Sequence, residues 1–81
     1  MSLFIPIKSP EDTKRLTARL EKLYYNKIIP DKDIKGNPIF RLQEVSAGAL
    51  VRVAIVVVIS PSQLLPVQTE LESYKKGAQD V

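Results

Sequence analysis

Acidic side chains with the spacing of a calcium loop occur in the segment Asp31–Gly36. Asp31 and Asp33 stand at alternate positions and a glycine follows at the sixth, as in the first half of an EF-hand loop. The fifth position is Lys35 rather than an oxygen donor, and the twelfth is Leu42 rather than the glutamate that such loops need. We therefore interpret the segment as a charged surface turn and predict no metal site.

Nucleophilic and acid–base catalysis lack their commonest residues. The chain has 81 residues and contains neither Cys nor His, so it has no thiol nucleophile, imidazole base, disulfide or zinc finger. Its three glycines do not have the spacing that cradles a phosphate. Ser–Lys or paired-carboxylate chemistry would need only residues that are present, but no spacing points to either. We predict that the protein is not an enzyme and needs no cofactor.

Basic side chains recur with helical spacing in the first third of the chain. Arg15, Arg19 and Lys22 fall at i, i+4 and i+7, and Tyr24 and Tyr25 follow them. Such a stripe could bind nucleic acid through phosphate contacts and base stacking. The alternative, which we favour, is a solvated helix face with tyrosines in the core, because adjacent residues of a strand point to opposite faces.

The charge balance suits an acidic partner. Twelve Lys and Arg side chains against nine Asp and Glu give a net charge of +3. The longest apolar run, Ala49–Ile59, is interrupted by Arg52 and is about half of the ~20 residues that a membrane helix needs. The first residues lack the basic segment of a signal peptide. We expect a cytoplasmic protein without membrane insertion.

The first elements are a strand and a helix. Residues 3–7 are apolar and predict a strand. Because proline cannot donate a ladder hydrogen bond, we expect this strand to lie at a sheet edge or Pro6 to sit at a bulge. Ser9 is expected to cap a helix that begins at Pro10, with acidic residues in its first turn, and ends near Lys22. Three leucines make its apolar face: Leu16, Leu20 and Leu23.

The middle of the chain is rich in strand signals. Residues 24–29 are predicted to form a strand that ends at Pro30, and residues 39–45 fit either a strand or a short helix. The clearest strand is Ala49–Ile59, which is apolar on both faces and is therefore expected to be central and covered twice. We expect Val53, Ile55 and Val57 to face the leucines of the first helix. A chain of this size cannot cover both faces itself, so another molecule is expected to cover part of the sheet.

A second helix is expected in the last part of the chain, starting at Ser60–Gln63 or at Pro66. Val67, Leu71 and Tyr74 keep the i, i+4, i+7 spacing of a buried face. The sequence therefore predicts a small single α+β domain with a roughly three-stranded sheet and two helices, in the order β-α-β-β-α or close to it. We divide it into an α+β domain over residues 1–60 and a helical extension over 61–81.

Two segments together resemble a known family. Residues 15–30 contain a basic helical stretch, an aromatic pair, a lysine, two aliphatic residues and a proline in that order. Residues 41–53 are similar to the signature Arg-Ile-x-x-hydrophobic-Gly-Gly-Lys-Ile-Val-x-Val. Both segments, and Phe4 in the first strand, resemble the small core linkers of phycobilisomes, the CpcD-like linker family. The resemblance covers about residues 3–55; the double glycine is Ala47-Gly48 here, and the segment after Pro30 is longer.

The resemblance implies a structural linker that sits in the opening of a ring of acidic phycobiliproteins, binds no pigment covalently and stabilises a light-harvesting antenna at the thylakoid surface. From the residues themselves we expect arginine and lysine to hold partner carboxylates and aromatic groups to anchor the contact. The candidate partner-binding residues are Phe4, Arg15, Arg19, Tyr25, Lys27, Arg41 and Arg52. The alternatives are a small basic nucleic-acid-binding domain and a homodimeric interaction module whose bare sheet face pairs with itself.

Overall fold

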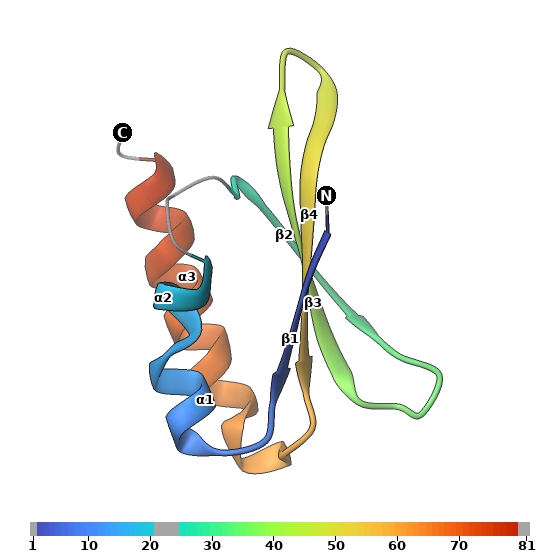
Figure 1. The fold of residues 1–81 in the computed structure, drawn as a ribbon, viewed down its shortest axis with the longest axis vertical. Coiled ribbons are helices and arrows are strands. Elements are labelled where there is room, and N and C mark those ends of the chain that lie inside the picture. Colours follow the sequence, from blue (N-terminus) through green and yellow to red (C-terminus); the bar gives the residue numbers. More distant parts are fainter. Residues whose placement is uncertain (1, 21–24, 80–81) are drawn as a thin grey trace.

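The computed structural model describes residues 2–20 and 25–79 as one sheet with helices packed on one of its faces (Figure 1). Its strands are β1 (Ser2–Ile7), β2 (Lys27–Lys32), β3 (Pro38–Ser46) and β4 (Ala49–Val58). Its helices are α1 (Pro10–Lys14), α2 (Leu16–Leu20) and α3 (Leu64–Gln79), the last preceded by a 3-10 turn, η1 (Pro61–Gln63).

The sheet is mixed and has the strand order β1-β4-β3-β2. β1 runs parallel to β4, whereas β2–β3 and β3–β4 are antiparallel pairs. The predicted α+β class is confirmed, but the sheet has four strands rather than about three. Residues 39–45, for which strand and helix were both open, lie within β3.

Proline positions agree with this strand order. Pro6 lies in β1 and Pro30 in β2, and these two strands form the two edges of the sheet. An edge strand tolerates proline because one of its sides needs no ladder donor. The predicted edge position of the first strand is confirmed. Pro30 does not end its strand, which continues to Lys32.

The central strand was predicted correctly, but the face of it that packs against the helices was not. β4 lies between β1 and β3, as its two apolar faces indicated. Its core side chains are Ala54, Val56 and Val58, whereas Val53 and Ile55 are only half-buried and point the other way. Val57 is buried outside the main core cluster. The alternation of side chains along a strand shows which residues share a face. When both faces are apolar, it does not show which face packs against the helices.

The helices and the sheet share one hydrophobic core. Leu16 and Leu20 are buried as predicted, and Leu23 lies outside the described residues. The segment 61–81, separated above as an extension, contains α3, whose buried side chains join the same cluster as the sheet. The described core comprises Ile5, Ile7, Leu16, Leu20, Tyr25, Phe40, Leu42, Ala54, Val56, Val58, Val67, Leu71 and Tyr74.

Two polar contacts inside the molecule join segments that are distant in the sequence. The Thr13 hydroxyl donates to Gln63 Oε1 at 2.9 Å, and both side chains are buried. The backbone N–H of Tyr25 donates to the Tyr74 hydroxyl at 3.3 Å, and the two rings pack with centroids 6.3 Å apart. The first contact links α1 to η1, and the second links the residues before β2 to α3.

The first helix begins where predicted, but it is interrupted at Arg15 into α1 and α2 and is stabilised by a different residue. Ser9 is the N-cap of α1, yet its side chain makes no capping hydrogen bond. Instead, the backbone N–H of Lys8 donates to Asp12 Oδ2 at 2.8 Å. This hydrogen bond lowers the pKa of the Asp12 carboxyl below its ordinary value, because it stabilises the charged form.

We expect Asp12→Ala to lower the melting temperature more than Ser9→Ala does. Ser9→Ala should cost less than the ~1 kcal/mol of a formed side-chain cap. Because the pKa of Asp12 is lowered on folding, its contribution is present above the pKa of the unfolded chain and is lost as the pH falls through the folded value. Thermal melts at neutral and acidic pH test this: the difference between wild type and Asp12→Ala should shrink in acid. A larger effect of Ser9→Ala would contradict the assignment.

Candidate protein interface

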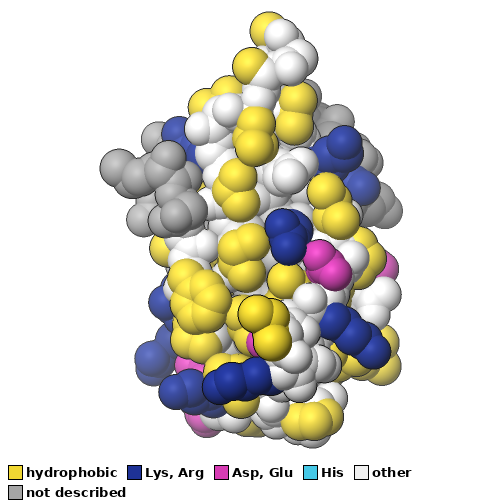
Figure 2. Space-filling model, turned by 90° about the vertical axis from the view of Figure 1, so that its right-hand side faces the viewer, with side chains coloured by type: hydrophobic (Ala, Val, Ile, Leu, Met, Phe, Trp, Pro, Cys, Tyr) yellow, Lys and Arg dark blue, Asp and Glu magenta, His cyan; other side chains and the backbone are white. Residues whose placement is uncertain are grey.

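The sheet face away from the helices, called the open face below, carries apolar side chains from all its strands. Residues that are paired across strands share a face, so the register defines its rows. One row consists of Phe4, Ile55, Arg41 and Ile29, and the next of Pro6, Val57, Ile39 and Asp31. Figure 2 looks onto this face and shows hydrophobic side chains along much of its length. In the described part of the chain, the helices lie on the other side (Figure 1).

The open face is hollowed between β1 and the turn that joins β2 to β3. Phe4, with a 60% exposed side chain, lines one side of this shallow depression, and Ile34 in the turn lines the other. The remaining lining residues are Asp33, Lys35, Asn37, Ile39, Ile55, Val57 and Ile59. The depression therefore has an apolar floor with polar groups only at its turn side.

The turn that forms the wall is held by its own hydrogen bonds. The Asp33 carboxylate accepts from the backbone N–H of Asn37 at 2.7 Å and from its side-chain amide at 3.1 Å. The N–H of Gly36 donates to the carbonyl of Asp33, and Gly36 has φ 86°, a conformation that glycine adopts without strain. Ile34 is fully exposed in this turn. An apolar side chain on a fixed, solvent-exposed turn is a candidate partner contact.

Charged groups lie among and around the apolar residues. Arg41 pairs with Asp31 at 3.2 Å on the open face, and both side chains are about half exposed. An exposed pair of this kind contributes roughly 0–1 kcal/mol to stability. Arg41 can therefore exchange Asp31 for a partner carboxylate at little cost in stability. Lysine and arginine side chains also lie along the borders of the apolar surface (Figure 2). The face combines apolar area with positive groups.

The candidate residues do not all gather on this face. Phe4 and Arg41 share a row, and Lys27 lies one row away, in register with Gln43 and Val53. The other four lie elsewhere. Arg15 and Arg19 are exposed at the helix layer on the far side of the sheet. Arg52 pairs with Glu44 at 2.8 Å, and Tyr25 is buried against Tyr74, where a partner cannot reach it.

Sequence reasoning missed Ile34 and did not assign Ile59 to a site. Ile34 stands among charged residues in a segment interpreted as a polar turn. The available signal was a single large apolar side chain in a polar turn, where it contributes nothing to the hydrophobic core. Ile59 follows the end of β4 and is 41% exposed at the border of the depression.

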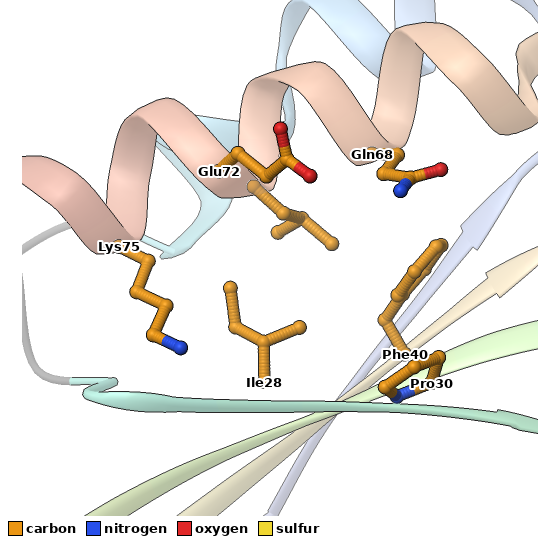
Figure 3. Close-up of a pocket in the computed structure, with 7 residues that line it drawn as sticks. Ile28, Pro30, Phe40, Gln68, Glu72 and Lys75 are labelled. Carbon is orange, nitrogen blue, oxygen red and sulfur yellow. The ribbon is translucent and has the colours of Figure 1, made fainter.

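A second, smaller pocket lies between α3 and β2 on the helix side of the sheet (Figure 3). Ile28, Pro30 and Phe40 approach it from the sheet, and Gln68, Glu72 and Lys75 from the helix. Its polar groups are one carboxylate, one amide and one ammonium group, from Glu72, Gln68 and Lys75. The pocket is a gap between α3 and the edge strand β2.

Known chemistry and known relatives give no further assignment. Within residues 2–20 and 25–79, no three acidic side chains come close enough to hold a metal ion. None of the described helices is both long and apolar enough to cross a bilayer. No protein-family model, curated protein or solved structure matches the chain. A functional proposal must therefore rest on the geometry of the open face.

Proposed function

We propose that this protein is a non-catalytic linker that binds an acidic protein subunit through the open face. The observation that carries the proposal is the apolar, helix-free side of the sheet, with Phe4 and Ile34 exposed on opposite sides of a depression. A monomer gains nothing from leaving such side chains in water, whereas a partner that covers them gains about 25 cal/mol for each Å² of apolar surface buried.

Charge supports an acidic partner. The chain has a net charge of +3, and Arg41 and Lys27 lie on the open face itself. An acidic surface would approach this face faster and would align against the arginine, which can bind a carboxylate through two parallel hydrogen bonds. A basic or neutral partner would lose this contribution.

The resemblance to phycobilisome linkers names the class of acidic partner. On this proposal the open face contacts phycobiliprotein subunits, and the protein stabilises their assembly as a peripheral component at the thylakoid surface. The absence of Cys agrees with a linker that carries no covalently bound bilin.

Nucleic acid is a weaker candidate because its required groups are separated. Base stacking would use Tyr24 or Tyr25; the Tyr25 ring is buried in the core, and Tyr24 lies outside the described residues. Phosphate contacts would use Arg15 and Arg19, which lie across the sheet from the exposed Phe4. Stacking and phosphate contacts must occur on one continuous surface to bind a single strand.

Binding to purified phycobiliprotein trimers, at low and high salt, tests the proposal. We expect wild-type binding to weaken in high salt without disappearing, because salt screens exposed charges and leaves apolar contacts. Phe4→Ser should weaken binding by about tenfold or more, as loss of an aromatic anchor does. Leu65→Ser is the matched control, since Leu65 is 71% exposed at the start of α3, outside the open face.

Two results would overturn the proposal. No binding of the wild-type protein to the trimers would remove phycobiliproteins as partners. Equal binding of Phe4→Ser and Leu65→Ser would remove the open face as the binding surface. Retention of the wild-type protein on nucleic acid that is lost steeply with salt would instead support the nucleic-acid alternative.

A further inference from the structure

The outward backbone groups of the edge strands are the part of the sheet that an added strand would bind. Along a strand, the N–H and C=O groups of alternate residues point to opposite sides within the sheet. The Ile7 carbonyl accepts from the N–H of Ile59 at 2.9 Å, so Ile7 directs its backbone groups toward the β4 side. By the same alternation, Phe4 and Pro6 direct theirs outward, away from β4.

Pro6 therefore lies where β1 would have to donate to an added strand. It has no N–H, and its ring occupies the space in which the partner's carbonyl would lie. β1 is otherwise uncharged and mostly apolar, and the Phe4 side chain is 60% exposed. A strand of this composition at an edge pairs readily with another chain unless something interrupts it. In β1 that interruption is Pro6.

The other edge strand, β2, also directs a proline outward. The N–H of Asp33 donates to the Asn37 carbonyl at 3.0 Å across the turn, so the odd-numbered residues of β2 face β3 and the even-numbered ones point outward. Pro30 is one of the outward residues and has no N–H. The N–H of the next one, Lys32, donates to Asp31 Oδ1 at 2.8 Å. Neither residue can donate to an added strand.

The hairpin between β3 and β4 extends past both edge strands, so its sides need separate protection (Figure 1). Among the described residues, β1 begins to pair with β4 at Val53, and β2 begins to pair with β3 at Gln43. Beyond Gln43, the next outward backbone groups of β3 belong to Val45. The Asn26 side chain donates to the Val45 carbonyl at 2.9 Å and accepts from the Val45 N–H at 3.1 Å. A single amide thus occupies both groups that an added strand would bind.

A β-bulge interrupts the β4 side of the same hairpin. Arg52 is in register with Glu44, and Leu50 is in register with Val45, which leaves Val51 as an extra residue between the two pairs. A bulge bends its strand and disrupts the regular order of the backbone groups, so a straight strand cannot pair along it.

We propose that the edges of this sheet are closed to strand addition, so that the acidic partner binds across the open face through side chains alone. This proposal rests on the proposed function and adds the mode of recognition. The two prolines, the Asn26 amide and the bulge at Val51 act at different places and have the same effect. A partner that extended the sheet would have to displace one of them, whereas a partner on the open face meets none of them.

A second copy of the chain is excluded from the edges for the same reason. Two antiparallel β1 strands centred on Phe4 would place Pro6 of each copy opposite Ser2 of the other. Each proline would then leave the opposite carbonyl without its donor and would press its ring against the facing strand.

Valine substitutions of the edge prolines, followed by sedimentation, test the closure without any partner. The wild-type protein should sediment as a monomer. Pro6→Val should lower the dissociation constant of self-association by about tenfold or more, because a symmetric pair regains two hydrogen bonds. Pro30→Val should have a smaller effect, since Asp31 and Lys32 leave charges on that edge. Pro66→Val is the matched control, because Pro66 is exposed in α3, away from both edges.

Amide hydrogen exchange identifies the surface that pairs. In the Pro6→Val dimer the outward N–H of Phe4 should become protected, whereas in the wild type it should exchange rapidly. Monomeric behaviour of both edge variants would overturn the proposal, as would a wild-type dimer in which the Phe4 N–H is protected. A wild-type dimer without that protection would support the closed edges and place a second copy on the open face, which would overturn the proposed function alone.

Binding to phycobiliprotein trimers tests the mode of recognition. The Pro30 side chain lies on the helix side of the sheet, in register with Phe40, so Pro30→Val leaves the open face unchanged. It should bind the trimers as tightly as the wild type does when both are compared as monomers. Binding that is tenfold tighter for Pro30→Val would show that the partner adds a strand at β2 and would overturn the side-chain mode.

Discussion

Leu42→Ala is expected to unfold a large fraction of the protein at room temperature. Leu42 is fully buried in β3, in register with Ala54 of the central strand and Ile28 of the edge strand. Removing three buried carbon atoms leaves a cavity that costs about 2–5 kcal/mol, because the surrounding sheet and helices collapse only partly. A domain of this size has a total stability of roughly 5 kcal/mol, so the loss is comparable with the whole.

Leu50→Ala is the matched control for this experiment. It makes the same chemical change on the adjacent strand, β4, at a side chain that is 56% exposed. We expect its effect on the free energy of unfolding to stay within about 0.5 kcal/mol. Urea denaturation followed by circular dichroism measures both values. Equal midpoints for the two variants would mean that Leu42 does not lie in the core.

Much of the fold could be predicted because several local signals agreed with the tertiary structure. The apolar run of β4 indicated a central strand, and Pro6 indicated an edge. The spacing of Val67, Leu71 and Tyr74 correctly identified the buried face of α3. Each of these signals depends on a constraint that tertiary packing does not override, such as the missing N–H of proline.

The errors occurred where the sequence is consistent with two arrangements. Val53, Ile55 and Val57 are as apolar as Ala54, Val56 and Val58, so only the position of the helices decides which set enters the core. Ser9 has the residue type of a cap, but Asp12 lies close enough to the Lys8 N–H to supply the hydrogen bond instead. Residues 39–45 form a strand because they pair with β2 on one side and β4 on the other. Local propensity does not reveal such long-range pairing.

The candidate site was predicted only in part, for a related reason. Phe4 and Arg41 meet on one face because the parallel pairing of β1 with β4 and the antiparallel pairing of β3 with β4 bring them into one row. This is a long-range register that sequence spacing does not reveal. Composition does not show on which side of the sheet each positive side chain lies. In the structure, the sheet separates Arg15 and Arg19 from Arg41.

The two neighbours Ile55 and Val56 provide the sharpest test of the open face as a binding surface. They are adjacent in the central strand and point to opposite sides of the sheet. Val56 is fully buried beneath the helices, so Val56→Asp would bury a carboxylate without a partner and should prevent folding. Ile55 is half-buried on the open face, directly across from Arg41, which can pair with an introduced carboxylate.

We therefore expect Ile55→Asp to give a folded protein that no longer binds its partner. The new carboxylate would be desolvated against an apolar surface and repelled by an acidic one, which should weaken binding by about 100-fold. Circular dichroism and urea denaturation report folding, and binding to phycobiliprotein trimers reports function. An Ile55→Asp variant that folds and binds like the wild type would exclude the open face. A variant that folds but fails to bind would separate the role of this face in binding from its role in stability, because stability depends on the opposite face through Val56.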